Sequence, residues 1–155
     1  MAQYTTMVQA TSNASANTED EFIELTAASG LSAFLKRVRI SCNSPNSDVA
    51  ITARVCILSA GGSGYTTGSA VKKRQNAPTA AVFTTIRVKN GTSAFSLGTV
   101  SSTLHQDNVN GRAIWEWIPR GNEEYVDSGV AGIIAIIIKV SSASIILNVN
   151  VEFEE

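Results

Sequence analysis

Residues 145 to 153 read IILNVNVEF, and this stretch decides the fold of the chain. Every second position is apolar, and asparagine or glutamate fills most of the positions between them. Because the side chains of a β-strand point alternately to the two faces of a sheet, this strand turns one face to a core and the other to water. The residues predicted to face the core are Ile145, Leu147, Val149, Val151 and Phe153.

The stretch just upstream, residues 133 to 138, reads IIAIII and is apolar on both faces. Such a strand must be covered twice, once by its own core and once by something else. In an antiparallel β-sandwich the second cover is often a neighbouring subunit, so we expect this strand to form an oligomer interface. The interface residues predicted here are Ile133, Ile134, Ile136, Ile137 and Ile138.

The bulk composition fits one β-rich domain. A chain of 155 residues is long enough to bury a core of its own. Charged residues make up 16% of the chain, against about 25% in an average soluble domain, and the formal net charge is −1. Without a global positive field, neither nucleic acid nor an anionic membrane is an expected partner.

Further strands are expected at short spacing, separated by turn signals such as Asn90-Gly91. They are predicted at 21–26, 34–42, 49–58, 81–89, 93–100, 112–118 and 124–126. Residues 59–79 and 101–111 are interpreted as long connections, which suit Greek-key crossings better than a meander. Residues 19–155 are therefore predicted to form an all-β, antiparallel β-sandwich, jelly-roll-like with about eight strands.

The first 18 residues are rich in small polar side chains, with only Tyr4, Met7 and Val8 to bury. Residues 1–18 are interpreted as an extended N-terminal arm, disordered alone or ordered against a partner. An edge strand of the sandwich is an equally good interpretation of the same residues.

The two cysteines are predicted to remain free thiols. On the alternating pattern Cys42 shares a face with Val38 and Ile40, whereas Cys56 falls on the face opposite Ile51. This parity argues against a disulfide bond, and free thiols favour folding in a reducing cytosol. The opening residues MAQYTTMVQATSNAS contain no basic residue and no apolar run, so they do not form a signal peptide.

The sequence contains no recognisable catalytic constellation. His105 is the only histidine, and its neighbours Leu104 and Gln106 offer no orienting acid. The ligand spacing of a zinc site is absent, and residues 107–111, which superficially resemble a calcium loop, are interpreted as a turn. The chain is therefore not expected to be an enzyme, and no catalytic, cofactor-binding or metal-binding residue is predicted.

Trp115 and Trp117 share one face of a predicted strand whose other face also carries large apolar groups. We therefore favour a role in the core and in the subunit interface over a platform that stacks sugars. Glu116 then lies on a largely apolar face and needs a cationic partner. The candidate partners are Arg37, Arg39, Arg54 and Arg87.

The densest basic run is Lys72-Lys73-Arg74. Three adjacent cations in a loop are usually a solvated tip. The functional interpretation is a contact with an acidic protein surface.

A polar start precedes EFIELTAASGLSAFLKRVRIS, the run DVAITARVCILSAGGSG follows, and RAIWEWIPRGNEEYVDSGVAGIIAIIIKVSSASIILNVNVEFEE closes the chain. With its early Lys-Arg-Val-Arg-Ile segment, its late Trp-rich strand and a final alternating strand with acidic ends, the chain resembles the capsid decoration (cement) proteins of tailed bacteriophages. The likeness covers most of the chain.

This resemblance implies a jelly-roll homotrimer at quasi-three-fold positions of an icosahedral head, made in the host cytoplasm and located on the capsid surface. The strand at 133–138 is then the subunit contact. The N-terminal arm and the polar loops lie across the major capsid protein and clamp neighbouring coat subunits against the pressure of packaged DNA. The capsid-contact residues expected on this basis are Tyr4, Met7, Val8, Lys72, Lys73 and Arg74.

Other functions stay open. A phage tail or fibre sandwich that binds host glycans, or other virion proteins, predicts an exposed Trp115 or Trp117. A secreted trimeric ligand of the tumour-necrosis-factor-like type predicts a signal peptide and a bridged cysteine pair, neither of which is expected here. An enzyme is the most distant alternative.

Overall fold

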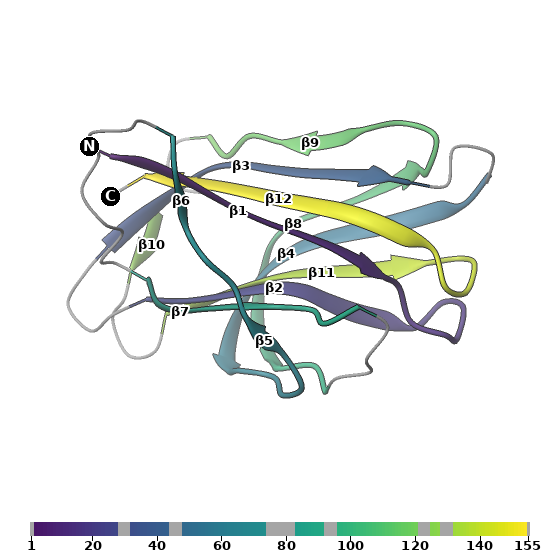
Figure 1. Ribbon diagram of the computed structural model, residues 1–155, viewed down its shortest axis with the longest axis horizontal. Helices are drawn as coiled ribbons and strands as arrows, with labels where there is room; N and C mark the ends of the chain where they lie inside the picture. Colours follow the sequence, from purple (N-terminus) through teal and green to yellow (C-terminus); the bar gives the residue numbers. More distant parts are fainter. Residues whose placement is uncertain are drawn as a thin grey trace.

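The computed structural model is an antiparallel β-sandwich (Figure 1). It describes residues 2–27, 32–43, 48–73, 83–91, 96–120, 125–127 and 132–154. These residues form twelve strands and no helix, and each of the two sheets contains six strands. The predicted all-β sandwich is confirmed.

The first sheet runs in the order β10, β3, β12, β1, β6, with β9 also paired to β3. Its strands are β1 (Gln3–Thr11), β3 (Ser32–Cys42), β6 (Val71–Lys72), β9 (Trp115–Trp117), β10 (Tyr125–Asp127) and β12 (Ile146–Glu154). The predicted strands at 34–42 and 124–126 are confirmed within a few residues as β3 and β10, and three residues of the one predicted at 112–118 form β9.

The second sheet runs in the order β5, β7, β2, β11, β4, β8. Its strands are β2 (Glu19–Ala27), β4 (Ala50–Ala60), β5 (Thr66–Thr67), β7 (Phe83–Val88), β8 (Thr99–Asn110) and β11 (Ile133–Val140). The chain changes sheet at each step from β1 to β4, and again between β11 and β12.

The alternation in β12 builds the core as predicted. Leu147, Val149, Val151 and Phe153 are fully buried, and the residues between them are more exposed. Three isoleucines of β11 face the same core from the second sheet. Removal of this apolar surface from water, at about 25 cal/mol per Å², is the main force that holds the two sheets together.

The predicted N-terminal arm is wrong, because residues Gln3–Thr11 form a strand within the first sheet. All nine residues of β1 pair with β12, from Gln3 opposite Glu154 to Thr11 opposite Ile146. The other edge of β1 meets the short strand β6. The alternative interpretation, an edge strand of the sandwich, is closer, but β1 is not the edge, because β6 pairs with its outer side at Tyr4 and Thr5.

The predictions for residues 93–111 were also wrong in part. The expected connection at 101–111 and the expected turn at 107–111 mostly belong to β8, a strand of 12 residues at the edge of the second sheet. Most side chains of β8 are exposed, because the strand pairs only with β4. Its serines, threonines and asparagines do not show the apolar alternation by which a strand is recognised.

Candidate functional site

The predicted oligomer interface lies inside a single chain. Residues 133 to 138 of β11 are between 0% and 8% exposed. Alternate residues face the main core, while Ile133, Ala135 and Ile137 form a second apolar cluster with Cys56 and Leu58. The prediction that a neighbouring subunit covers this strand is therefore wrong, since the chain supplies both covers.

Two glycine-containing segments lie against the outer face of the second sheet, and we call them the strap: residues 61–65 and 96–98. A β-bridge between Ser63 and Ser96 joins the two segments. A Cβ on Gly62 would lie 2.3 Å from the Ser96 carbonyl oxygen, and one on Gly98 would lie 2.5 Å from a Leu58 methyl carbon. Only glycine permits so close an approach of backbone to backbone and to the sheet.

Two buried carboxyl groups anchor the strap. The Gly98 amide donates to Glu21 Oε2 at 3.1 Å, and the Gly62 amide donates to Glu24 Oε2 at 2.9 Å. Arg87 Nη1 donates to Glu24 Oε1 at 3.0 Å. Both glutamates are 0% exposed.

A β-bulge explains how both acids reach one face of the sheet. Ile23 lies opposite Ile136 of β11, but Glu21 lies opposite Ile137, so Phe22 is an extra residue in β2. In a regular strand, residues three positions apart point to opposite faces. The extra residue places Glu21 and Glu24 together on the outer face.

Burial raises the pKa of Glu21 to about 7, against the opposing effect of the Gly98 amide, and the neighbouring charge of Glu24 adds to the increase. Burial and the Glu21 carboxyl also raise the pKa of Tyr65 in the strap. Each carboxyl group has a protein donor, so this pair anchors the strap and is not an open acid–base site.

Trp115 and Trp117 close one open side of the sandwich. They are 5% and 6% exposed, so the prediction that they belong to the core is confirmed. Their rings stack on His105 of β8, with centroids 6.0 Å and 5.2 Å away, and Trp115 Nε1 donates to Asp107 Oδ2 at 3.2 Å. These contacts connect the edge strands of the two sheets.

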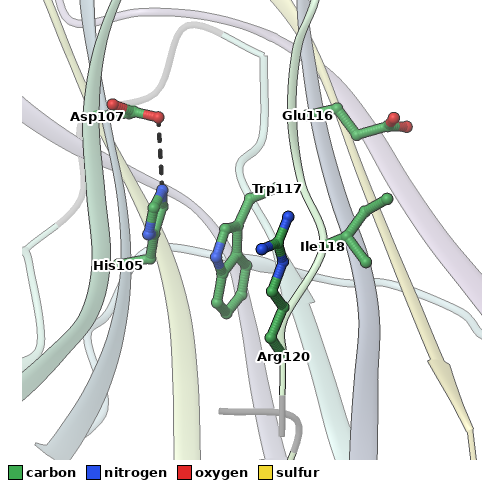
Figure 2. Close-up of a pocket in the computed structure, with 6 residues that line it drawn as sticks. All are labelled: His105, Asp107, Glu116, Trp117, Ile118 and Arg120. Atoms are coloured by element: carbon green, nitrogen blue, oxygen red, sulfur yellow. Dashed lines mark ion pairs between the residues drawn. The ribbon is translucent and has the colours of Figure 1, made fainter.

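His105 has an acidic partner that its immediate sequence neighbours do not reveal. Its Nε2 lies 3.5 Å from Asp107 Oδ2, two residues along the same strand (Figure 2). Hydrogen bonds from Trp115 and His105 lower the pKa of Asp107. Residues i and i+2 of a strand share a face, but residues 101–111 were expected to form a connection, so the sequence analysis did not find this pair.

The pocket beside this pair has a volume of about 460 Å³. Its lining residues are His105, Asp107, Glu116, Trp117, Ile118 and Arg120 (Figure 2). The described lining residues include no serine, threonine or cysteine that the histidine could activate as a nucleophile. Trp117 is 6% exposed and stacks on His105, so little of its ring is available to stack on a sugar.

The residues predicted to contact a capsid have separate locations. Tyr4 and Val8 are buried in the core, and Tyr4 stacks on Phe153 with ring centroids 5.5 Å apart. They are therefore not available to a partner, and this part of the prediction is wrong. Met7 is 75% exposed on the outer face of the first sheet.

Of the basic run, Lys72 is exposed at the end of β6, and Lys73 forms an ion pair with Glu152. Arg74 lies outside the described residues. Lys73 therefore belongs to a network on the outer face of the first sheet, and is not a free loop tip.

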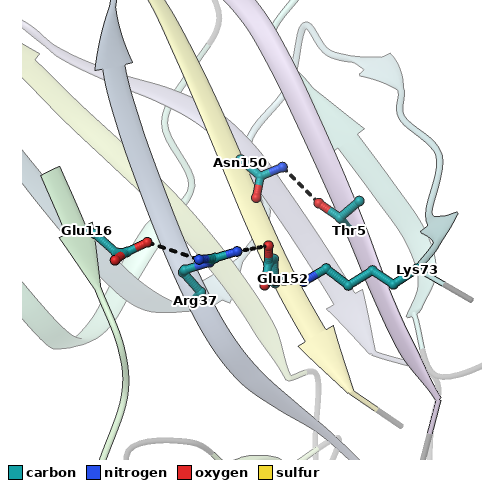
Figure 3. A network of polar contacts seen from close by, with 6 residues as sticks. All are labelled: Thr5, Arg37, Lys73, Glu116, Asn150 and Glu152. Atoms are coloured by element: carbon teal, nitrogen blue, oxygen red, sulfur yellow. Dashed lines mark hydrogen bonds and ion pairs between the residues drawn. The ribbon is translucent and has the colours of Figure 1, made fainter. Parts of the chain in front are cut away.

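This network links five strands or their ends across the outer face of the first sheet (Figure 3). Arg37 of β3 pairs with Glu152 of β12 and, at 3.2 Å, with Glu116 of β9. Of the four arginines proposed as partners of Glu116, Arg37 is thus the one that binds it. Asn150 Nδ2 donates to Thr5 Oγ1 of β1 at 2.8 Å.

The network neutralises its own charges. Hydrogen bonding to Glu152 raises the pKa of Arg37. Burial alone would raise the pKa of Glu152, but Arg37 and Lys73 outweigh burial and lower it. At the end of β12, Glu154 pairs with Lys36 at 3.3 Å.

Large apolar side chains surround this network. Of the seven exposed large hydrophobic residues in the described part of the chain, five lie on strands of the first sheet or beside them. They are Met7, Val71, Ile114, Ile118 and Ile146, between 40% and 75% exposed. We call these five residues the apolar rim. The outer face of the first sheet is the best candidate for an interaction surface.

None of the described residues forms a group of three or more potential metal ligands, and none forms a helix that could cross a membrane. Cys42 and Cys56 lie on different sheets and form no disulfide bond with each other, as their parity predicted, and burial raises the pKa of Cys56. Comparison of the chain with family models, curated proteins and solved structures gives no match.

Proposed function

We propose that the chain is a virion structural protein, a capsid decoration (cement) protein that binds as a homotrimer to the outer surface of the major capsid protein lattice. The observation that carries the proposal is the outer face of the first sheet, where apolar side chains surround charges of which Arg37, Lys73, Glu116 and Glu152 are already paired. Such a face is easily buried, because a partner would not leave these charges without a counter-ion.

The fold supports a structural role. A sandwich whose described residues form no helix, with a low share of charged residues, presents sheet faces of the kind that assemblies use. The strand order of both sheets, with a change of sheet at each early step, supports the proposed jelly-roll topology, two Greek keys folded across two sheets. Stabilisation of a head would come from area buried over many copies.

The trimer contact proposed here differs from the one expected from the sequence. Because β11 is buried within one chain, the remaining exposed apolar residues are the candidates for subunit and capsid contacts. Binding to host glycans has weaker support, since the two tryptophan rings are buried.

The proposal is tested by light scattering on the purified chain, followed by co-sedimentation with empty expanded capsids. We expect a mass near three times 16.4 kDa and saturable binding to the capsids. A monomer that does not sediment with capsids would contradict the proposal.

A further inference from the structure

We infer that the hollow around Arg39, at the centre of the outer face of the first sheet, is a docking site for an acidic side chain of a protein partner. This inference deepens the proposed function and rests on it for the identity of the partner, which would be the coat protein. The site itself is argued from the geometry and charge of this face.

The hollow has a volume of about 420 Å³. It is lined by Arg37, Arg39, Ser41, Asn148, Asn150 and Glu152. All six residues lie on the neighbouring strands β3 and β12, in registers that place Asn150 opposite Arg39 and Asn148 opposite Ser41. Two paired strands therefore fix the backbone positions from which the six described lining side chains project.

Arg39 is the charged group of this lining that remains available. Arg37 and Glu152 bind each other, whereas Arg39 is exposed and has no ion pair among the described residues. A guanidinium group binds a carboxylate through two parallel hydrogen bonds. The Ser41 hydroxyl adds a further donor. Asn148 and Asn150 already donate one N–H each, to Asn43 and Thr5, and keep a second, so the hollow is suited to one carboxylate.

The apolar rim indicates that the carboxylate belongs to a protein. Met7 on β1 lies to one side of the hollow, across β12, and Ile118 follows β9 on the other side. A partner that inserts an aspartate or glutamate beside Arg39 would bury these side chains at the same time. A charged anchor enclosed by apolar contacts that exclude water is the usual anatomy of a protein interface.

Other occupants fit this face less well. A second copy related by a two-fold axis through the hollow would place Arg39 against Arg39, and the like charges would repel. Nucleic acid requires several free cations along one face, but the other cations of the network are paired.

The site is tested by NMR titration of the ¹⁵N-labelled full chain with the peptide acetyl-Ala-Leu-Glu-Leu-Ala-amide. We expect chemical-shift changes at Arg39, Ser41 and Asn150, and binding about tenfold weaker for Arg39→Gln, since a hydrogen bond to a charged group is lost. Arg120→Gln, an exposed arginine outside the hollow, is the matched control and should bind like the wild type. No shift on this face, or equal shifts with inorganic phosphate, would overturn the inference.

Empty expanded capsids separate the failure of the site from the failure of the proposed function. If the wild type and Arg39→Glu bind capsids equally, the docking site is wrong and the decoration role stands. If the peptide binds at Arg39 but capsids do not bind the wild type, the site stands and the decoration role fails. Binding of the wild type and of Arg120→Gln, with loss of binding in Arg39→Glu, supports both.

Discussion

Glu21 accepts a hydrogen bond from the Gly98 amide at a position from which water is excluded. The protonation state of its carboxyl group therefore affects the free energy of unfolding. Burial raises its pKa from 4.5 to about 7. The folded chain therefore holds this proton more tightly than the unfolded chain does. The stabilisation is complete below about pH 4.5 and is lost as the pH rises through about 7, a loss of about 3 kcal/mol.

We predict that Glu21→Gln removes this part of the pH dependence, because the amide stays neutral. Urea unfolding at pH 5.0 and pH 8.5 measures it: the wild type should be less stable at the higher pH, and the variant should show a much smaller difference. Glu116→Gln, at an exposed position, is the control and should follow the wild type. If Glu21→Gln loses as much stability between pH 5.0 and pH 8.5 as the wild type does, the burial of this carboxyl group is contradicted.

Gly98→Ala tests the close approach of the strap to the second sheet. The added methyl group would lie 2.5 Å from the Ala60 carbonyl oxygen and from Leu58. We predict a destabilisation of roughly 1–3 kcal/mol, typical of overpacking, together with faster hydrogen exchange of the Gly62 amide. Ser63→Ala, on the exposed side of the strap, is the control and should change neither the stability nor the hydrogen exchange of the Gly62 amide. If Gly98→Ala also changes neither, the strap is not packed on the sheet.

At the scale of the elements, β1 is part of the fold and not an appendage. Its removal would expose the whole edge of β12 and leave Phe153 without Tyr4, its stacking partner. We predict that a chain without residues 1–11 loses cooperative thermal unfolding, followed by circular dichroism. Tyr4→Ala should show a partial effect of about 3–5 kcal/mol, by analogy with the loss of other buried aromatic groups. A truncated chain with a sharp, unshifted transition would restore the arm interpretation.

The sequence predicted those elements whose burial follows a simple period. β12 alternates strictly, and β11 is apolar from Ile133 to Ile138, so both were found. β8 was missed because its polar side chains face solvent at the edge of a sheet. The acid pair was missed because a single bulge residue, Phe22, reverses the parity of β2, and no short pattern announces a bulge.

For the whole molecule, Ile136→Asp separates the fold from the assembly. Ile136 is 0% exposed in a single chain, so a charge there is buried without a partner. We predict that Ile136→Asp does not fold, as judged by the loss of a cooperative thermal transition, whereas Ile118→Asp on the apolar rim keeps the native transition. A folded, monomeric Ile136→Asp would instead restore the subunit interface expected from the sequence.

The candidate site followed from the sequence only in part. The sequence correctly indicated that β11 is covered on both faces. It did not indicate that the strap lies against the outer face, because nothing in the pattern of its glycines shows where they pack. Glu116 and its need for an arginine were also recognised. The register between β3 and β9 places Arg39 directly opposite Glu116, yet the ion pair forms diagonally with Arg37, so the choice among the four candidates depends on side-chain positions that only the folded structure provides.

The pairing of β1 with β12 sets an order of events for folding. The centre of the first sheet joins residues near the two ends of the chain, Gln3 beside Glu154, and the two labelled ends lie side by side (Figure 1). Hairpins of neighbouring strands close quickly. Pairing β1 with β12 closes a loop that contains almost the whole chain, and the conformational entropy lost in closing so long a loop makes this pairing late. During synthesis β1 must therefore wait, with its apolar row unpaired, until β12 has left the ribosome. Most strands of the second sheet have been synthesised by then. β12 therefore pairs with β1 when much of the sandwich has already formed.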